Sequence, residues 1–199
     1  MFSFKDDYIL ENERALLVPL KKESDIIHLL PYSLKEPDLW KYSLQSAAGK
    51  ENMEKYIRMA LEKREIEDSY PFLIHDKSTK QVAGSTRFYD YQAHHKTVQL
   101  GYTWLGRSFQ GTGLNRFCKS LMLNFAFDKM EIERVEFRAD ATNAKSISAM
   151  KAIGCEEEGI LRSNCASPDG RRDSIILSIL RSEWYASKKE ALEQKCYLK

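Results

Sequence analysis

The residue pattern with the clearest chemical meaning is a glycine-containing segment near the middle of the chain. It lies between a predicted strand and a strongly periodic predicted helix, and it reads Gln110, Gly111, Thr112, Gly113, Leu114, Asn115. Glycines let the backbone turn tightly with successive N–H groups pointing outward, and the partial positive charge of a helix start adds to them. The segment therefore predicts a site for an anionic group such as a phosphate, with a plain strand-to-helix turn as the alternative.

Two familiar phosphate motifs do not fit this segment. A Walker loop needs Gly-Lys-Ser/Thr, whereas Gly113 is followed here by Leu114 and Asn115. A dinucleotide fingerprint needs a third glycine where this chain has Arg116, and it needs a strand–helix–strand unit where the preceding strands form hairpins. Nucleotide hydrolysis and NAD chemistry are therefore disfavoured.

Cysteine and histidine show no pattern typical of a metal site or a catalytic pair. The four cysteines are scattered without a CxxC pair, at Cys118, Cys155, Cys165 and Cys196. We expect free thiols and no metal. Cys165 is kept as a candidate nucleophile, although no base partner for it is evident. The adjacent His94 and His95 are expected to be exposed in a hairpin turn, pointing to opposite sides.

The elements that must position the glycine segment alternate as in a mixed α/β sheet. Strands are predicted at 14–20, 70–75, 81–89, 98–105, 135–139, 155–164 and 174–180, the last two joined by a turn at Pro168-Asp169-Gly170. Helices are predicted from Ser24 and Asp25 to an end at Pro31, at 51–65, from Leu114 onward and at 144–153. We expect an α+β fold in which a central mixed, mostly antiparallel sheet of six to seven strands is flanked by about four helices.

Length and composition favour a soluble enzyme or binding module. The 199 residues predict one domain, 1–199, in which 185–199 form a C-terminal helical tail. Lys and Arg number 31 against 29 Asp and Glu, so the broad positive field of a nucleic-acid-binding protein is missing. Charged residues interrupt the first 20 positions, and no stretch has the roughly 20 apolar residues that span a bilayer. We expect a cytoplasmic protein that binds neither nucleic acid nor membrane.

Several short segments around the glycine loop occur together in one enzyme family. Gln110 and Gly113 match a Gln/Arg-x-x-Gly-x-Gly/Ala signature, from which Asn115 departs in the last position. The other matches are Gly101-Tyr102-Thr103-Trp104, Asn143-Ala144-Lys145-Ser146, Ile153-Gly154, Asp169-Gly170-Arg171-Arg172-Asp173 and Glu183-Trp184. With these segments the chain resembles the GNAT family of N-acetyltransferases from about Arg14 to Trp184, and in particular its branch of ribosomal-protein alanine acetyltransferases (RimJ/RimL-like).

This resemblance implies acetyl-CoA as the acyl donor and a role for each matching segment. Residues 110–115 would bind the pyrophosphate, and the strand edge at Trp104 and Leu105 would pair with the pantetheine arm. Asn143 would contact the cofactor and can also cap the helix that follows it. Ser146, in the first turn of that helix, would protonate the leaving thiolate, or would only satisfy a backbone N–H.

The position of the catalytic base differs from the family pattern. Many members are thought to use a glutamate on the strand before the loop, and the comparable residue here is Gln99, which cannot accept a proton. Gln99 would orient water or the acceptor, or is a plain strand residue. Four other carboxylates are candidates for a base that acts through water: Asp90, Glu157, Glu158 and Asp173.

The missing base bears on which amine is the acceptor. A free α-amino group is roughly 10 to 20% neutral at pH 7, whereas a lysine side chain is only about 0.04% neutral. We therefore expect direct transfer of acetyl to a primary amine, with a protein N-terminus favoured. The alternatives are a small amine, such as a polyamine or an antibiotic, and a non-catalytic acyl-CoA-binding module. A homodimer is left open.

Overall fold

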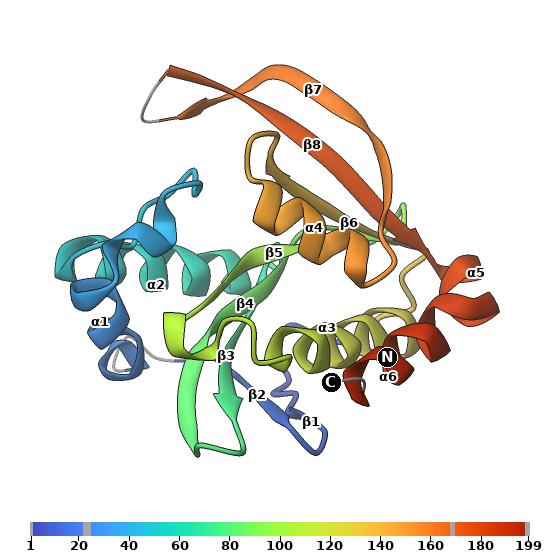
Figure 1. Cartoon of the computed structure of the whole chain (residues 1–199), viewed down its shortest axis with the longest axis horizontal. Helices are drawn as coiled ribbons and strands as arrows, with labels where there is room; N and C mark the ends of the chain where they lie inside the picture. Colours follow the sequence, from blue (N-terminus) through green and yellow to red (C-terminus); the bar gives the residue numbers. More distant parts are fainter. Residues whose placement is uncertain (1, 22–24, 168–169, 198–199) are drawn as a thin grey trace.

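The chain folds around one sheet that runs through the whole molecule (Figure 1). The computed structural model describes residues 2–21, 25–167 and 170–197. The strands are β1 (Leu10–Glu11), β2 (Ala15–Pro19), β3 (Tyr70–Asp76), β4 (Gln81–Gln92), β5 (Thr97–Leu105), β6 (Arg134–Asp140), β7 (Glu156–Ser167) and β8 (Gly170–Leu180). Their order in space is β1-β2-β3-β4-β5-β6-β8-β7, and the β5–β6 pair is parallel whereas the others are antiparallel.

This topology confirms the expected mixed, mostly antiparallel sheet and corrects its size. Eight strands are present in the described chain where six to seven were expected. The additional strand is β1, which pairs Leu10 with Leu17 and Glu11 with Leu16. A two-residue strand has no alternation that a sequence pattern can detect, so its pairing partner alone defines it.

Helices cover both faces of the sheet. One face carries α1 (Ile26–Lys35), the short helix η2 (Pro37–Trp40) and α2 (Lys50–Glu65). The other face carries α3 (Leu114–Asn124), its π-helical extension η4 (Phe125–Lys129), α4 (Ala144–Ala152) and the C-terminal series α5 (Arg181–Glu183), η5 (Trp184–Lys188) and α6 (Lys189–Tyr197). Figure 1 shows α1 and α2 on one side of β4 and β5, with α3 and α6 lying next to each other on the other side.

The prediction that Pro31 ends the first helix was wrong, because α1 continues through it to Lys35. Hydrogen bonds to distant segments hold the second half of the helix in place. The Ser33 hydroxyl donates to the carbonyls of Ala47 and Gly49 at 2.6 and 2.9 Å, and the Tyr32 hydroxyl donates to Val82 O. These contacts offset the backbone hydrogen bond that proline cannot donate.

The C-terminal series is packed against the rest of the molecule. The Trp184 side chain is fully buried and stacks on Phe127 with ring centroids 5.5 Å apart. Leu192 of α6 is also buried, and Lys195 Nζ donates to Ala152 O at 3.0 Å. The tail therefore forms part of the core on the α3 face.

Some expectations fall on residues that the structure does not describe, namely Ser24 as a helix cap and Pro168 and Asp169 in the β7–β8 turn. Within the described ranges, no helix combines the length and the apolar character needed to cross a bilayer.

Candidate active site

A cleft opens in the sheet where β5 and β6 separate. These strands pair only from Thr97 to Gln99 against Arg134 to Glu136, and β6 then continues with β8 alone. The cleft has a volume of about 1210 Å³ and is lined by residues from both faces of the sheet. The edge of β5 beyond Gln99 is therefore free to pair with a ligand.

A β-bulge turns β5 away from β6. Ser85 of β4 pairs with Trp104, whereas Arg87 pairs with Gly101, so β5 has one more residue than β4 over this stretch. Tyr102 has a φ of 48°, a left-handed conformation that is uncommon for a residue other than glycine. The bulge therefore lies at the point where the strands part, and such distortions often mark functional sites.

The glycine segment lies at the end of the cleft that is formed by the C-terminus of β5, between β5 and α3. Gly111 and Gly113 have φ values of 75° and 86°, which agree with the expected tight turn. Within the described chain, the backbone N–H groups of Gly111, Thr112 and Gly113 donate no hydrogen bond. Asn115 Oδ1 is buried and has no hydrogen-bond partner among the described residues. Unpaired donors beside a helix start form a cradle that suits a phosphate.

Side chains hold this cradle in shape. Gln110 Nε2 donates to Leu105 O at 2.8 Å, while its Oε1 accepts from Lys145 Nζ of α4. The Thr112 hydroxyl donates to Phe109 O at 2.8 Å. The Leu114 side chain is fully buried in the core, so only its backbone can face a ligand. Gln110 thus ties the loop to both sides of the cleft.

The strand residues expected to meet pantetheine have their side chains buried. Trp104 is 8% exposed and packs edge-on against Trp40 and Tyr32, at centroid distances of 5.1 and 5.7 Å. Leu105 belongs to the core on the opposite face. Their backbone edge, rather than their side chains, faces the opening toward β6.

Asn143 and Ser146 come from the start of α4, on the other side of the cleft. Asn143 caps the helix, since its Oδ1 accepts from Ser146 N at 3.1 Å. Both residues line the cleft. The Ser146 hydroxyl makes no hydrogen bond to any described residue, which leaves it available to a ligand.

Gln99 lies in the cleft at the point of divergence and holds a carboxylate. Its Nε2 donates to Asp90 Oδ2 at 2.6 Å, and Gln92 Nε2 donates to Asp90 Oδ1 at 2.8 Å. Gln99 is 6% exposed, and its Oε1 accepts no hydrogen bond from the part of the chain that the structure describes. Of the four carboxylates considered as bases, Asp90 alone lines the cleft among the described residues. The structure therefore brings Gln99 and Asp90 together as a unit.

The part of the cleft on the α1–α2 face is aromatic and contains a buried guanidinium. Arg87 is 4% exposed, and its guanidinium lies 3.4 Å from the ring centre of Tyr102 and 5.1 Å from that of Tyr56. The Nε of Arg87 donates to none of the described residues. Nearby, burial raises the pKa of Tyr89 far above its ordinary value. These rings provide a wall for an organic acceptor.

A buried lysine lies on the opposite, α3 face of the cleft. Lys119 is 6% exposed, and its Nζ donates to Thr103 Oγ1 of β5 at 2.7 Å. The same nitrogen is 5.8 Å from the ring centre of Phe137 on β6, so it lies between the two separating strands. Burial lowers the pKa of Lys119 to about 8, because the charged form loses hydration.

The sequence alone did not identify Arg87 and Lys119 as site residues. Arg87 lies within a strand pattern, and Lys119 lies next to the apolar stripe of a helix, so both positions are compatible with an exposed surface. Only the parallel crossover from β5 through α3 to β6 places Lys119 under the opening. No local signal distinguishes it from the other lysines of the chain.

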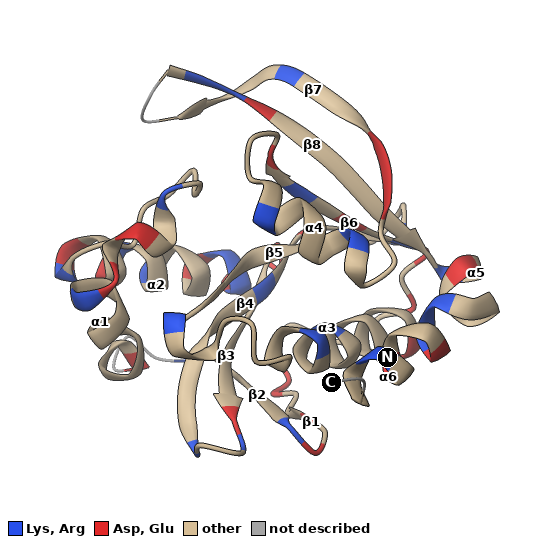
Figure 2. Ribbon diagram, viewed as in Figure 1, with Lys and Arg blue, Asp and Glu red and all other residues tan. Residues whose placement is uncertain are grey.

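Electrostatically the cleft favours anions. Among the described residues that line it, nine are Lys or Arg and four are Asp. Figure 2 shows basic residues on α3 and α4, the helices that border the proposed phosphate end. A chain that is almost neutral overall therefore concentrates positive charge in its cleft, which is suited to a ligand with several phosphates.

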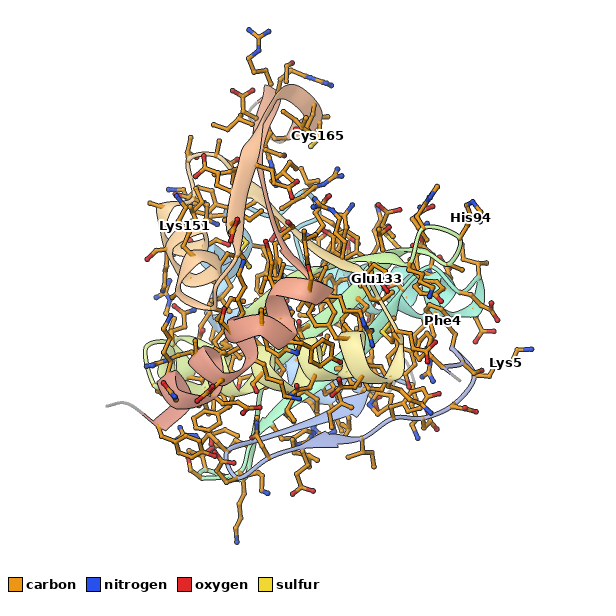
Figure 3. All side chains as sticks on the ribbon, turned by 90° about the vertical axis from the view of Figure 1, so that its right-hand side faces the viewer. Phe4, Lys5, His94, Glu133, Lys151 and Cys165 are labelled. Carbon is orange, nitrogen blue, oxygen red and sulfur yellow. The ribbon has the colours of Figure 1, made fainter. Side chains whose placement is uncertain are left out.

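The adjacent histidines are exposed as expected, but they do not point to opposite sides, because their ring centroids lie 5.0 Å apart. His94 and His95 are exposed at the β4–β5 turn, and Figure 3 shows His94 at the outer edge of the molecule. No group of three potential metal ligands occurs within the described residues. Cys165 lies on the projecting β7–β8 hairpin (Figure 3), where Ser174 Oγ is 3.7 Å from its sulfur. No histidine or carboxylate pairs with Cys165 in the described structure, so its environment does not activate a nucleophile.

Comparisons with known proteins agree with this architecture. A family model described as the acetyltransferase (GNAT) domain matches residues 14–156. The Bacillus subtilis (strain 168) protein named "Putative ribosomal N-acetyltransferase YdaF" is 27% identical over 116 residues, which are 58% of this chain and 61% of that protein. The matches to this relative and to the N-acetyltransferase p20 of Bacillus licheniformis each cover less than two thirds of this chain and less than two thirds of the relative.

Solved structures share the fold over almost the whole chain. A GCN5-related N-acetyltransferase from Brucella melitensis superposes with a TM-score of 0.88 and 21% identity, covering 98% of this chain and 87% of that one. The microcin C7 self-immunity acetyltransferase MccE, solved with acetyl-CoA and AMP, gives a TM-score of 0.75 at 21% identity, with coverages of 85% and 93%. At this identity the similarity shows the fold alone.

Proposed function

This chain belongs to the GNAT acetyltransferase family, and from that premise we propose that it transfers the acetyl group of acetyl-CoA directly to a primary amine. The observation that carries the proposal is the opening between β5 and β6, with a free strand edge and a cradle of unpaired N–H groups at its mouth. These features match the two chemical parts of CoA, an amide-bearing arm and a pyrophosphate.

On the donor side, the residues present fit CoA. The N–H groups of the glycine loop would hold the pyrophosphate, with Lys145 and Arg116 contributing charge from the cleft wall. The backbone of Trp104 and Leu105 would pair with the arm. Asn115 Oδ1, which is buried without a partner, would accept a hydrogen bond from the ligand. When bound, acetyl-CoA supplies an activated thioester, and the protein need only orient it.

On the acceptor side, Asp90 would act as the base and Gln99 would hold it in position. Asp90 would take the proton from the attacking amine, directly or through water, and the amide of Gln99 fixes the position of the carboxylate. The free Oε1 of Gln99 can accept a hydrogen bond from the same amine. The role proposed for Gln99 is therefore to orient both the acceptor and the base.

Ser146 is the proposed proton donor to the departing sulfur. Its hydroxyl lines the cleft and has no hydrogen-bond partner among the described residues, while its backbone N–H donates to the Asn143 cap. A hydroxyl at a helix start lies in the partial positive field of that helix, which favours donation to an anion.

The acceptor that we propose is the α-amine of a protein N-terminus. The excess of basic residues in the cleft disfavours a polyamine, because like charges repel. The relative named "Putative ribosomal N-acetyltransferase YdaF" supports a protein acceptor for this chain.

Calorimetry with acetyl-CoA, followed by transfer assays on a panel of N-terminal peptides and polyamines, tests the proposal. We expect acetyl-CoA binding, turnover of one or more peptides, and much slower turnover of polyamines. Binding without turnover above solvent background would instead identify a non-catalytic acyl-CoA-binding module. If acetyl-CoA does not bind, the proposal fails.

A further inference from the structure

Lys119 is a buried ammonium group that pairs with no carboxylate among the described residues. It is 6% exposed, and its Nζ donates one hydrogen bond within the described chain, to the Thr103 hydroxyl. That hydroxyl in turn lies 2.7 Å from the Thr86 hydroxyl of β4. Keeping a charge out of water is costly unless an anion compensates it. Such an anion is expected to bind at this position during the reaction.

The groups that surround Lys119 are neutral. Cys118 on the same helix and Cys155 after α4 are the titratable groups that influence it, and burial raises the pKa of each thiol to about 12. The sheet contributes the hydroxyl of Thr103 and the ring of Phe137. The negative charge that would balance the ammonium therefore has to come from a ligand.

The position of Lys119 along the cleft indicates which part of a bound CoA molecule would lie beside it. A CoA molecule whose pyrophosphate lies on residues 110–115 and whose arm pairs with Leu105 and Trp104 reaches Thr103 next, since β5 runs away from the loop in that direction. The sulfur end of the arm consequently lies at the level of Thr103 and Tyr102. Lys119 Nζ is 2.7 Å from Thr103 Oγ1, on the α3 side of this point.

We propose that Lys119, together with the hydroxyls of Thr103 and Thr86, forms a binding site for the thiolate that acetyl transfer leaves on CoA. This inference rests on the proposed function. As the acceptor nitrogen bonds to the acetyl carbon, the carbon–sulfur bond breaks and its electron pair remains on sulfur, while the amine proton passes to Asp90. The ammonium pairs with the new thiolate before Ser146 or water protonates it.

A thiolate site differs from a plain cofactor contact because it acts only on charged sulfur. Acetyl-CoA carries no charge on its sulfur, so the ion pair with Lys119 arises as the leaving group departs. Interactions of this kind, stronger in the transition state than in the ground state, are the ones that accelerate a reaction. The lowered pKa of Lys119, about 8, still keeps the amine mostly protonated at pH 7.

The test compares the binding of CoA and of desulfo-CoA, which lacks the sulfur, and needs no acceptor. At pH 7 wild type should bind CoA about tenfold more tightly than desulfo-CoA, because a neighbouring lysine that lowers the pKa of the bound thiol from about 8.5 to about 6 leaves that thiol mostly ionised. Calorimetry in two buffers of different ionisation enthalpy should also detect proton release with CoA and none with desulfo-CoA. Lys119→Met should abolish both differences.

The matched control is Lys145→Met, which removes another lysine from the cleft wall. Lys145 bonds Gln110 in the phosphate loop, so its loss should weaken CoA and desulfo-CoA by the same factor and leave their ratio unchanged. Thermal unfolding checks that the Lys119 variant folds, and Lys119→Gln replaces it if the methionine variant does not.

Two results would overturn the thiolate site. One is an equal affinity of wild type for the two ligands, or the same ratio in wild type and Lys119→Met. The other is an acetyl group found on Lys119 by peptide mass spectrometry after incubation with acetyl-CoA, which would make this lysine an acceptor instead. If neither CoA nor desulfo-CoA binds wild type, the proposed function itself is contradicted.

Discussion

Replacing Asp90 by asparagine tests the proposal that Asp90 is the base and that Gln99 only positions it. The change keeps the size of the side chain but removes its ability to take a proton. Each carboxylate oxygen of Asp90 accepts one amide hydrogen, from Gln92 at 2.8 Å and from Gln99 at 2.6 Å. An asparagine can keep one of these bonds, so the stability cost is about 1 kcal/mol.

The kinetic cost should be larger than the structural one. A positioned base contributes about 10² to 10⁴ in rate, and the lower end applies to an α-amine that is already roughly 10 to 20% neutral at pH 7. We expect kcat/KM of Asp90→Asn to fall about 100-fold at pH 7, which corresponds to about 2.7 kcal/mol. At pH 9 the amine is largely neutral and needs less help, so the loss should narrow to about tenfold or less.

Steady-state kinetics on one peptide acceptor at both pH values provide the measurement. Asp68→Asn is the matched control, because Asp68 also lines the cleft but pairs with Lys63 at 3.4 Å rather than with Gln99. The control should stay within about threefold of wild type, as a surface ion pair contributes little. Equal rates for the two variants, or a loss for Asp90→Asn that does not narrow with pH, would refute the role of Asp90.

Three further changes probe the frame of the site. Gly84→Ala should lower the free energy of unfolding in urea by at least about 1–3 kcal/mol and weaken acetyl-CoA binding, because the new Cβ would lie 2.0 Å from Trp104 O. The control is Gly49→Ala, which has open space around it and should cost only about 1 kcal/mol. Asn143→Ala should cost about 1 kcal/mol through the lost helix cap, and an unchanged midpoint would contradict that cap. For Lys119 the folded pKa of about 8 lies below the unfolded 10.5, so the unfolded state binds more protons and wild-type stability should rise between these pH values. Lys119→Met should accordingly gain about 3 kcal/mol at pH 7 and little at pH 10.5, and a gain independent of pH would show that the buried charge is not its cause.

The elements that can be predicted from sequence are those whose signal is local. The helix after Gly113 has an apolar repeat and a glycine turn before it, and the strands at 70–105 are bounded by polar turns. Pro31 predicted the wrong helix end, because hydrogen bonds from Tyr32 and Ser33 to distant segments stabilise the helix beyond it. The short strand β1 had no pattern of its own.

The residues of the site likewise fall into two groups: those that local sequence could locate and those that only the fold brings together. The glycine loop and Asn143 could be located because a turn and a helix cap each need particular residues at fixed spacing. The sequence also indicated that Gln99 replaces the usual carboxylate. It could not indicate that Asp90, nine positions earlier, lies within hydrogen-bond distance of Gln99, since that contact depends on the register of β4 against β5.

The sequence by itself determined the family and the glycine turn before α3, and it predicted a phosphate site at that turn and the replacement of the usual base by Gln99, because each depends on residue types along a continuous segment. The tertiary structure decided the rest: the bulge at Tyr102, the opening between β5 and β6, and the burial of Lys119 beneath it. A lysine on a helix is ordinarily solvated. Only the packing of α3 under the two separating strands removes Lys119 from water and leaves its charge to be balanced by a ligand.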